Sequence, residues 1–223
     1  MIKLPVIIIN FKTYEKATGK KAEQLALLCE KVSKDTGKNI AIAVQAADIY
    51  RITQKVSIPV LSEHLDPEEP GKHTGKITGE DIKANGAIGT LLNHSEDRYR
   101  VDVLEKAIEK AKQLELISVV CANNSEVAES IAAFEPDIIA IESPELIGTK
   151  TSISEARPEI VTETVDKIKR IQPNAVILCG AGIHTAEDVK KALELGTKGV
   201  LLANAVTEAD DPEEVLRELI KGL

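Results

Sequence analysis

The stretch Leu4-Pro5-Val6-Ile7-Ile8-Ile9-Asn10-Phe11-Lys12 passes from a β-branched run directly into an amide and a cation. An apolar run without polar alternation is typical of a parallel strand covered on both faces. Two later runs end in a similar way: 89–93 is followed by His94, and 137–141 by Glu142. In a closed parallel barrel the carboxyl ends of the strands meet at one rim, where catalytic residues lie. The sequence therefore predicts a site at that rim.

Short apolar segments alternate with longer amphipathic segments almost to the end of the chain. The predicted strands are Val6–Asn10, Ile40–Val44, Pro59–Ser62, Gly89–Leu92, Ser118–Cys121, Ile138–Ile141, Ala175–Cys179 and Gly199–Leu202. Helical spacing gives three apolar faces: Ala22, Leu25, Ala26, Cys29 and Val32; Leu104, Ala107, Ile108, Ala111 and Leu114; and Val161, Thr164, Val165, Ile168 and Ile171. About eight strand–helix repeats predict a (β/α)8 TIM barrel, expected to form one domain over residues 1–223.

Helix starts are marked by capping residues. Asp211-Pro212-Glu213-Glu214 combines a capping Asp with Pro at the first helical position, and Thr185-Ala186-Glu187-Asp188 resembles a capping box. Ser95-Glu96-Asp97 also has the form of a helix start, which would direct backbone N–H groups towards His94. The alternative fold, a doubly wound open sheet, needs a glycine-rich fingerprint after an early strand, and the first strand ends in Asn-Phe-Lys instead.

Composition narrows the classes of partner. The net charge of −8 argues against nucleic acid, which requires a basic face. Three widely spaced cysteines give neither a disulfide framework nor metal-ligand spacing, so we expect a reducing, cytoplasmic location and no metal. The first apolar run is too short for a signal sequence, and no membrane-spanning stretch follows it.

Several motifs occur in a fixed order, each at the carboxyl end of a predicted strand or just beyond it: Asn10-Phe11-Lys12, 91–96 (LLNHSE), 140–142 (AIE), 144–149 (PELIGT) and 179–183 (CGAGI). Together they resemble the triosephosphate isomerase family, in particular its short archaeal type. The resemblance implies interconversion of dihydroxyacetone phosphate and glyceraldehyde 3-phosphate through an enediol(ate), without a cofactor. It also implies a homodimer or a homotetramer, because Thr74-Gly75 is similar to a loop that reaches a neighbouring subunit.

The resemblance assigns a role to each reactive residue. Glu142 matches the base that moves the proton between carbons, and His94 matches the neutral electrophile that polarises the carbonyl. Lys12 matches the cation that supports substrate binding and the developing oxyanion. Glu96 matches the acidic partner of this lysine, and Asn10 matches the amide that orients it.

Phosphate binding is expected from backbone N–H groups after the seventh and eighth strands. The candidates are Gly180, Ala181 and Gly182 in the first of these loops and Ala203 and Asn204 in the second. The segment 144–152 resembles a lid, in which Ile147 and Gly148 match the part that meets phosphate.

Some positions depart from the family pattern. Ser143 and Lys150 stand where the family usually has Pro and Gly. In the eighth loop, Ala203-Asn204-Ala205 replaces the more familiar Ala-Ser-Gly or Gly-Gly. Val44 and Glu63 stand where Pro and Gln are usual. Two alternatives therefore stay open. One is another sugar-phosphate isomerase or epimerase, and the other is a barrel that binds triose phosphate without turning it over.

Overall fold

The computed structural model describes residues 2–142, 152, 154, 157–180 and 182–223. The strands are β1 (Val6–Asn10), β2 (Asn39–Val44), β3 (Val60–Ser62), β4 (Gly89–Leu92), β5 (Ile117–Ala122), β6 (Ile138–Ile141), β7 (Val176–Gly180) and β8 (Gly199–Leu202). The helices are α1 (Lys20–Thr36), α2 (Ala46–Thr53), α3 (Gly79–Ala84), α4 (Val101–Gln113), α5 (Ser125–Ala132), α7 (Pro158–Ile171), α8 (Ala186–Glu194), α9 (Asn204–Thr207) and α10 (Pro212–Leu219), with 3-10 turns at Glu15–Ala17 and Ile220–Gly222.

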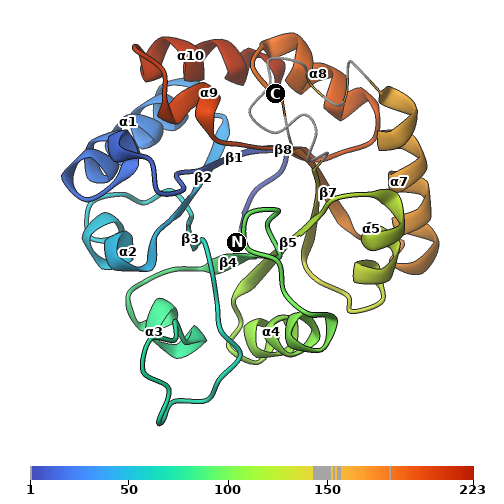
Figure 1. Cartoon of the computed structure of the whole chain (residues 1–223). Coiled ribbons are helices and arrows are strands. Elements are labelled where there is room, and N and C mark those ends of the chain that lie inside the picture. The colour runs from blue at the N-terminus through green and yellow to red at the C-terminus, as the bar shows by residue number, and fades with distance from the viewer. Residues whose placement is uncertain (1, 143–151, 153, 155–156, 181) are drawn as a thin grey trace.

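The eight strands form a closed barrel in sequence order, and every neighbouring pair is parallel. Figure 1 shows this barrel at the centre, surrounded by the helices. The predicted (β/α)8 fold is therefore confirmed. Four predicted strands have the observed bounds, and the others differ by a residue at one or both ends. Pro59, predicted to begin a strand, precedes β3 because proline has no N–H to donate to the ladder.

Side chains on the strands alternate between two apolar clusters. Val6 and Ile8 of β1 belong to a cluster inside the barrel, together with Leu61, Leu91, Ala140 and Leu178. Ile7 and Ile9 belong to the larger cluster between the strands and the helices. This period of two decides which side chain at the end of a strand turns into the barrel mouth.

The predicted helix starts at the carboxyl end of the chain are confirmed. The Asp211 side chain accepts from the N–H of Glu214 at 3.0 Å. Thr185 and Asp188 form a reciprocal capping box at the start of α8. The prediction that Ile171 shares the buried face of its helix is wrong. Its side chain is 44% exposed because it occupies the last position of α7, where the chain turns towards β7.

The segment between β3 and α3 extends outwards from the ring at the lower left of Figure 1. Its base is held together by Asp66, whose carboxylate accepts from Lys76 Nζ at 2.9 Å and from the N–H of Ile77 at 2.8 Å. The tip, residues 69–76, is exposed. None of the helices in the described part of the chain is long and apolar enough to cross a membrane.

Gly199 closes the barrel and provides a test of the fold. It pairs with Val6, has a φ of +145°, and a Cβ there would lie 2.0 Å from the Val6 carbonyl oxygen. We expect Gly199→Ala to lower the free energy of unfolding by about 3 kcal/mol, through backbone strain and steric conflict. Chemical denaturation measures the change. Gly71→Ala is the control, since its Cβ would meet other atoms at 3.7 Å or more. Equal stability of the two variants would contradict this account of closure.

Candidate active site

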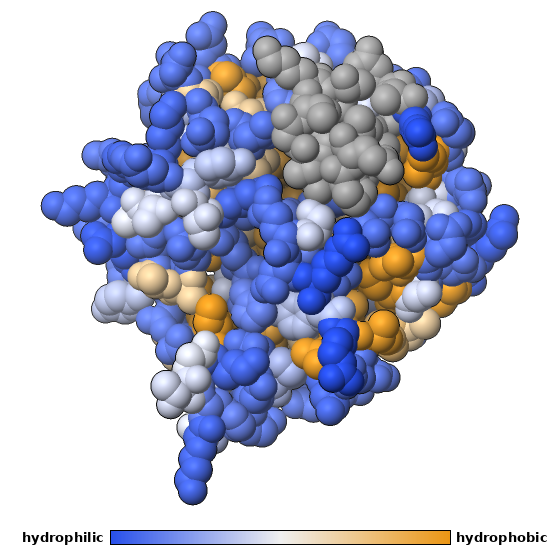
Figure 2. Space-filling view, viewed as in Figure 1, coloured by the Kyte–Doolittle hydropathy of each residue, from blue (hydrophilic) through white to orange (hydrophobic). Residues whose placement is uncertain are grey.

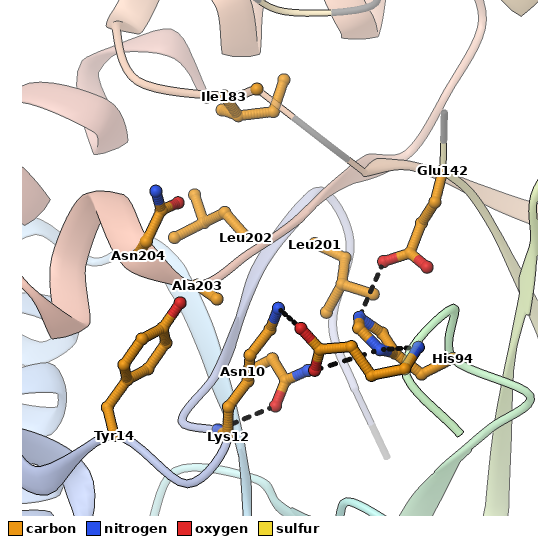
Figure 3. Close-up of a pocket in the computed structure, with 12 residues that line it drawn as sticks. Asn10, Lys12, Tyr14, His94, Glu142, Ile183, Leu201, Leu202, Ala203 and Asn204 are labelled. Carbon is orange, nitrogen blue, oxygen red and sulfur yellow. Dashed lines mark hydrogen bonds and ion pairs between the residues drawn. The ribbon is translucent and has the colours of Figure 1, made fainter. Parts of the chain in front are cut away.

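A cavity of about 250 Å³ opens at the carboxyl ends of the strands. This volume is below the usual range for drug-sized ligands and suits a small metabolite better than a dinucleotide. Figure 3 shows the side chains converging on it from β1, β4, β6, β7 and β8. Its lining consists of Asn10, Lys12, Tyr14, His94, Glu96, Glu142, Gly182, Ile183, Leu201, Leu202, Ala203 and Asn204.

The alternation along the strands explains why Asn10 and Glu142 line this cavity. Asn10 lies two residues beyond Ile8, and Glu142 lies two residues beyond Ala140, and both Ile8 and Ala140 point inside the barrel. Positions two apart share a face of a strand, so both polar side chains turn inwards at the rim. Sequence prediction placed these two residues in the site, and the structure brings them together there.

Lys12 reaches the cavity through an unusual backbone conformation. Its φ is +49°, in the left-handed region, and its N–H donates to Asn10 Oδ1 at 3.1 Å. A non-glycine residue in this region costs on the order of 1 kcal/mol and is typical of functional sites. The ammonium group donates to Glu96 Oε1 at 2.7 Å, and the lysine side chain is 13% exposed while that of Glu96 is 58% exposed. Of the described residues that line the cavity, Lys12 alone is a cation.

His94 lies in a turn rather than before a helix, so the predicted helix start at Ser95-Glu96-Asp97 is wrong. The N–H of Asp97 donates to the His94 carbonyl at 2.9 Å, and α4 begins at Val101. The N–H of Glu96 nevertheless donates to His94 Nδ1 at 3.2 Å. A nitrogen that accepts a hydrogen bond carries no proton, so the neutral imidazole holds its proton on Nε2. Nε2 is the nitrogen that faces Glu142.

Glu142 is almost completely enclosed, with 5% exposure. Its Oε1 lies 3.2 Å from His94 Nε2, and its own N–H donates to the Ala122 carbonyl at 2.8 Å. Cys121 lies inside the barrel next to it. Burial, followed by the negative charge of Glu142, raises the pKa of the Cys121 thiol well above its ordinary value. This cysteine therefore stays a neutral neighbour and adds no charge against the carboxylate.

Gly180 makes room for Glu142. A Cβ at Gly180 would lie 2.9 Å from Glu142 Cγ and 3.2 Å from the Ile141 carbonyl oxygen. Gly180 is the last residue of β7, on the same inward face as Leu178, and it is not among the residues that line the cavity. The structure thus places this predicted phosphate-binding residue behind the carboxylate.

Three of the other predicted phosphate-binding residues line the cavity. These are Gly182, with a φ of +71°, and Ala203 and Asn204, where β8 passes into the short helix α9. Figure 3 shows Ala203 and Asn204 across the cavity from Glu142. The predictions for Ile147, Gly148 and Ala181 lie outside the described residues, as do Ser143 and Lys150.

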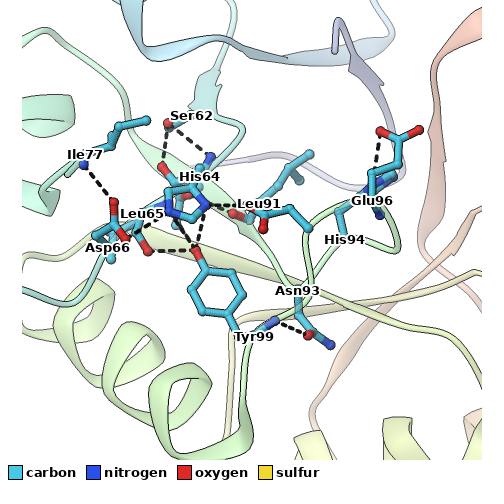
Figure 4. Close-up of polar contacts among 12 residues, drawn as sticks. Ser62, His64, Leu65, Asp66, Ile77, Leu91, Asn93, His94, Glu96 and Tyr99 are labelled. Atoms are coloured by element: carbon cyan, nitrogen blue, oxygen red, sulfur yellow. Dashed lines mark hydrogen bonds and ion pairs between the residues drawn. The ribbon is translucent and has the colours of Figure 1, made fainter. Parts of the chain in front are cut away.

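A second layer of polar contacts holds the strand ends behind His94 (Figure 4). Asn93 has a φ of +58°, its Nδ2 donates to the Cys121 carbonyl at 2.9 Å, and its Oδ1 accepts from the N–H of Tyr99 at 3.1 Å. The Tyr99 hydroxyl donates to the Leu65 carbonyl at 2.8 Å and lies 3.0 Å from His64 Nδ1. The segments that follow β3 and β4 are therefore tied together next to the imidazole.

Sequence reasoning missed several residues of the site. Tyr14 lines the cavity two residues beyond Lys12, a proximity along the chain that could have been used. Cys121 lies next to Glu142, and Asn93 makes hydrogen bonds with Cys121 and Tyr99. Nothing local in the sequence marks either residue. Glu63, known from the sequence only as a departure, has its pKa raised to about 8, chiefly by burial.

The cavity opens on a face that is mostly hydrophilic where its residues are described (Figure 2). Among those residues no group of three or more His, Cys, Asp or Glu side chains is arranged to hold a metal ion. The reactive groups that the described site offers are thus a buried carboxylate, a neutral imidazole and one ammonium group.

Comparisons with known proteins agree with this arrangement. The family model described as triosephosphate isomerase matches residues 5–222. A triosephosphate isomerase of Methanobacterium bryantii is 49% identical over 219 residues, covering 98% of this chain and 97% of that protein. Those of Methanocaldococcus jannaschii and Methanothermus fervidus are 47% and 46% identical over 216 residues, covering 97% of this chain and 99% and 97% of their own.

The packing of Gly180 against Glu142 can be tested by a crystal structure of Gly180→Ala. The added methyl group would lie too close to Glu142 Cγ, so the carboxylate must move. We expect the distance from Glu142 Oε1 to His94 Nε2 to lengthen from 3.2 Å to beyond hydrogen-bonding range, about 3.5 Å or more. The Gly71→Ala protein should keep the original distance. An unmoved carboxylate in Gly180→Ala would show that this glycine does not set its position.

Proposed function

The chain belongs to the triosephosphate isomerase family, and on that premise we propose that it interconverts dihydroxyacetone phosphate and D-glyceraldehyde 3-phosphate at this cavity. The reaction moves a proton between adjacent carbons through an enediol(ate). The observation that carries the proposal is the convergence of Glu142 and His94, 3.2 Å apart, in the cavity that Lys12 also lines.

Glu142 is the proposed base. Its burial removes water that would otherwise solvate the carboxylate, and its inward direction points it at the cavity. Glu142 Oε1 lies 3.2 Å from His94 Nε2, so a substrate that meets both groups must enter between them. Once there, its carbon-bound proton faces the carboxylate and its carbonyl oxygen faces the imidazole. A positioned base of this kind contributes about 10²–10⁴-fold to a rate.

His94 is the proposed electrophile. The N–H of Glu96 leaves Nδ1 without a proton, and Nε2–H remains to donate to the oxygen on which negative charge develops. A neutral donor can stabilise that oxygen through its Nε2–H while keeping this proton. This role depends on the backbone of Glu96, whereas the side chain of Glu96 holds Lys12.

Lys12 and Asn10 are proposed to supply electrostatic stabilisation. Asn10 Oδ1 holds the N–H of Lys12, which fixes the turn that brings the ammonium group over the cavity. The Glu96 carboxylate keeps that ammonium at one place. A charge fixed in advance stabilises a transition state without the cost of reorganising solvent.

The phosphate group is proposed to bind at Gly182, after β7, and at Ala203 and Asn204, where β8 passes into α9. Barrel phosphate sites commonly lie at the loops after the seventh and eighth strands and at the start of a short extra helix. The family resemblance adds Ile147, Gly148, Ala181 and Gly180 to this set. For Gly180 the contact with Glu142 supports a role in placing the base.

We also propose a cytoplasmic protein of one domain that requires neither cofactor nor metal and assembles as a homodimer or a homotetramer. The outward extension of residues 69–76 beyond the ring supports the assembly, because an exposed arm of this kind can reach a second subunit.

The isomerase proposal is tested with Glu142→Gln in a coupled assay on glyceraldehyde 3-phosphate. The amide cannot accept the carbon-bound proton, so turnover should fall by about 10³-fold. Binding of glycerol 3-phosphate, followed by calorimetry, should persist because the phosphate-binding residues are unchanged. Glu109→Gln, on the exposed face of α4, should keep wild-type turnover.

Two outcomes would contradict the proposal. Full activity in Glu142→Gln would remove this residue as the base. An inactive wild-type protein that still binds the phosphate analogue would favour the non-catalytic barrel, and turnover of a larger sugar phosphate instead would favour another isomerase or epimerase.

The assembly is tested by light scattering coupled to size-exclusion chromatography. A single chain has a mass of 24.1 kDa, so a dimer or a tetramer should elute at about two or four times that value. Replacing Thr74 by Arg at the tip of the arm should shift the mass towards the monomer, whereas Lys38→Arg, at an exposed position after α1, should not. A wild-type monomer at micromolar concentration would overturn the proposal.

A further inference from the structure

Glu63 is a carboxyl group beside the site that the proposed reaction does not use. It directly follows β3, and its N–H donates to the Val44 carbonyl at 3.1 Å. Its Oε1 is enclosed, and no described residue offers it a hydrogen bond. A buried, unpartnered carboxylate oxygen is costly, whereas a protonated carboxyl group is much less so.

The surroundings of Glu63 explain its protonation. The pKa of Glu63 is raised from the ordinary 4.5 to about 8, and burial is the largest cause. Repulsion from the Glu96 carboxylate, in the segment after β4, and from the Asp48 carboxylate, on α2, contributes to this rise. The N–H and the ammonium group of Lys12 oppose these effects without overcoming them. Glu63 is therefore mostly neutral at pH 7.

We propose that Glu63 is a positioning residue whose neutral carboxyl group packs against the main chain of Lys12 and leaves the Lys12 charge available to an anionic substrate. The proposal rests on the isomerase function given above. Lys12 has a left-handed backbone and its ammonium is already shared with Glu96, so a second ionised carboxylate nearby would hold the cation more tightly. It would also repel the phosphate.

The consequence is a loss of substrate affinity at alkaline pH. As the pH rises through about 8, Glu63 ionises and adds a negative charge next to the cavity. Substrate binding weakens, so KM rises, while kcat changes less because Glu142 and His94 are not themselves altered. We expect the negative charge of the ionised Glu63 carboxylate to raise KM about tenfold.

The test compares KM and kcat of the wild type and of Glu63→Gln between about pH 6 and 9.5. The amide has the shape of the neutral carboxyl group and cannot ionise. We expect the wild-type KM to rise about tenfold more than that of Glu63→Gln over this range. Glu109→Gln is the control, because Glu109 is an exposed carboxylate on α4. It should follow the wild-type profile.

The outcomes separate this proposal from the isomerase function. Alkaline profiles that coincide in wild type and Glu63→Gln, with both proteins active, overturn the role of Glu63 alone. Absence of turnover in the wild type at every pH overturns the function on which it rests. Any titration of the substrate affects both proteins alike, so the difference between their profiles isolates Glu63.

Thermal unfolding gives a second readout that does not depend on turnover. Because the pKa of Glu63 is higher in the folded than in the unfolded chain, its ionisation penalises folding. The penalty is absent below about pH 4.5, grows as the pH rises, and is complete above about pH 8. The melting temperature of Glu63→Gln relative to wild type should therefore increase from pH 5 to pH 9. A constant difference would mean that Glu63 does not titrate in this range.

Discussion

The alternation of inward and outward side chains along closed parallel strands is the constraint on which the site depends. Ile8 and Ala140 point inside the barrel, so Asn10 and Glu142, two positions further on, must turn into its mouth. A slip of one residue in the pairing of either strand would turn its polar end outwards. Because Gly199 lets β8 approach Val6 closely, closure fixes the register of the first strand, and with it the place of Asn10.

The parts of the molecule that the sequence predicts are those determined by local pattern. Runs such as Val6–Asn10 and Ile138–Ile141 are too apolar to be loops and too short to be helices, so their existence and even their bounds are correct. The reactive residues at their ends follow from the same pattern. The chemical roles of those residues, in contrast, are assigned from the family resemblance. The family model matches residues 5–222, which shows the family and does not show the role of each residue.

Features that depend on contacts between distant segments could not be predicted in this way. Ser95-Glu96-Asp97 has the composition of a helix start, yet Asn93 accepts from the N–H of Tyr99 and the chain stays in a turn until Val101. The sequence Gly180-Ala181-Gly182 predicts a phosphate-binding role for Gly180 and gives no sign of a contact with Glu142. A Cβ at Gly180 would come closest to Glu142, which directly follows the adjacent strand β6, and this becomes apparent only when the strands are paired.

The side chains that line the cavity offer little net positive charge to attract an anion. Lys12 is the single cation among the described lining residues; its ammonium group is paired with the Glu96 carboxylate, and Glu142 lines the same cavity. In the proposed function, backbone N–H groups after β7 and β8 supply much of the attraction for phosphate, since they add positive potential without a counter-charge. In such a balance one further ionised carboxylate matters more than it would on an open surface. Burial is the main reason that the pKa of Glu63 is raised to about 8, so this carboxyl group is mostly uncharged beside Lys12 at neutral pH.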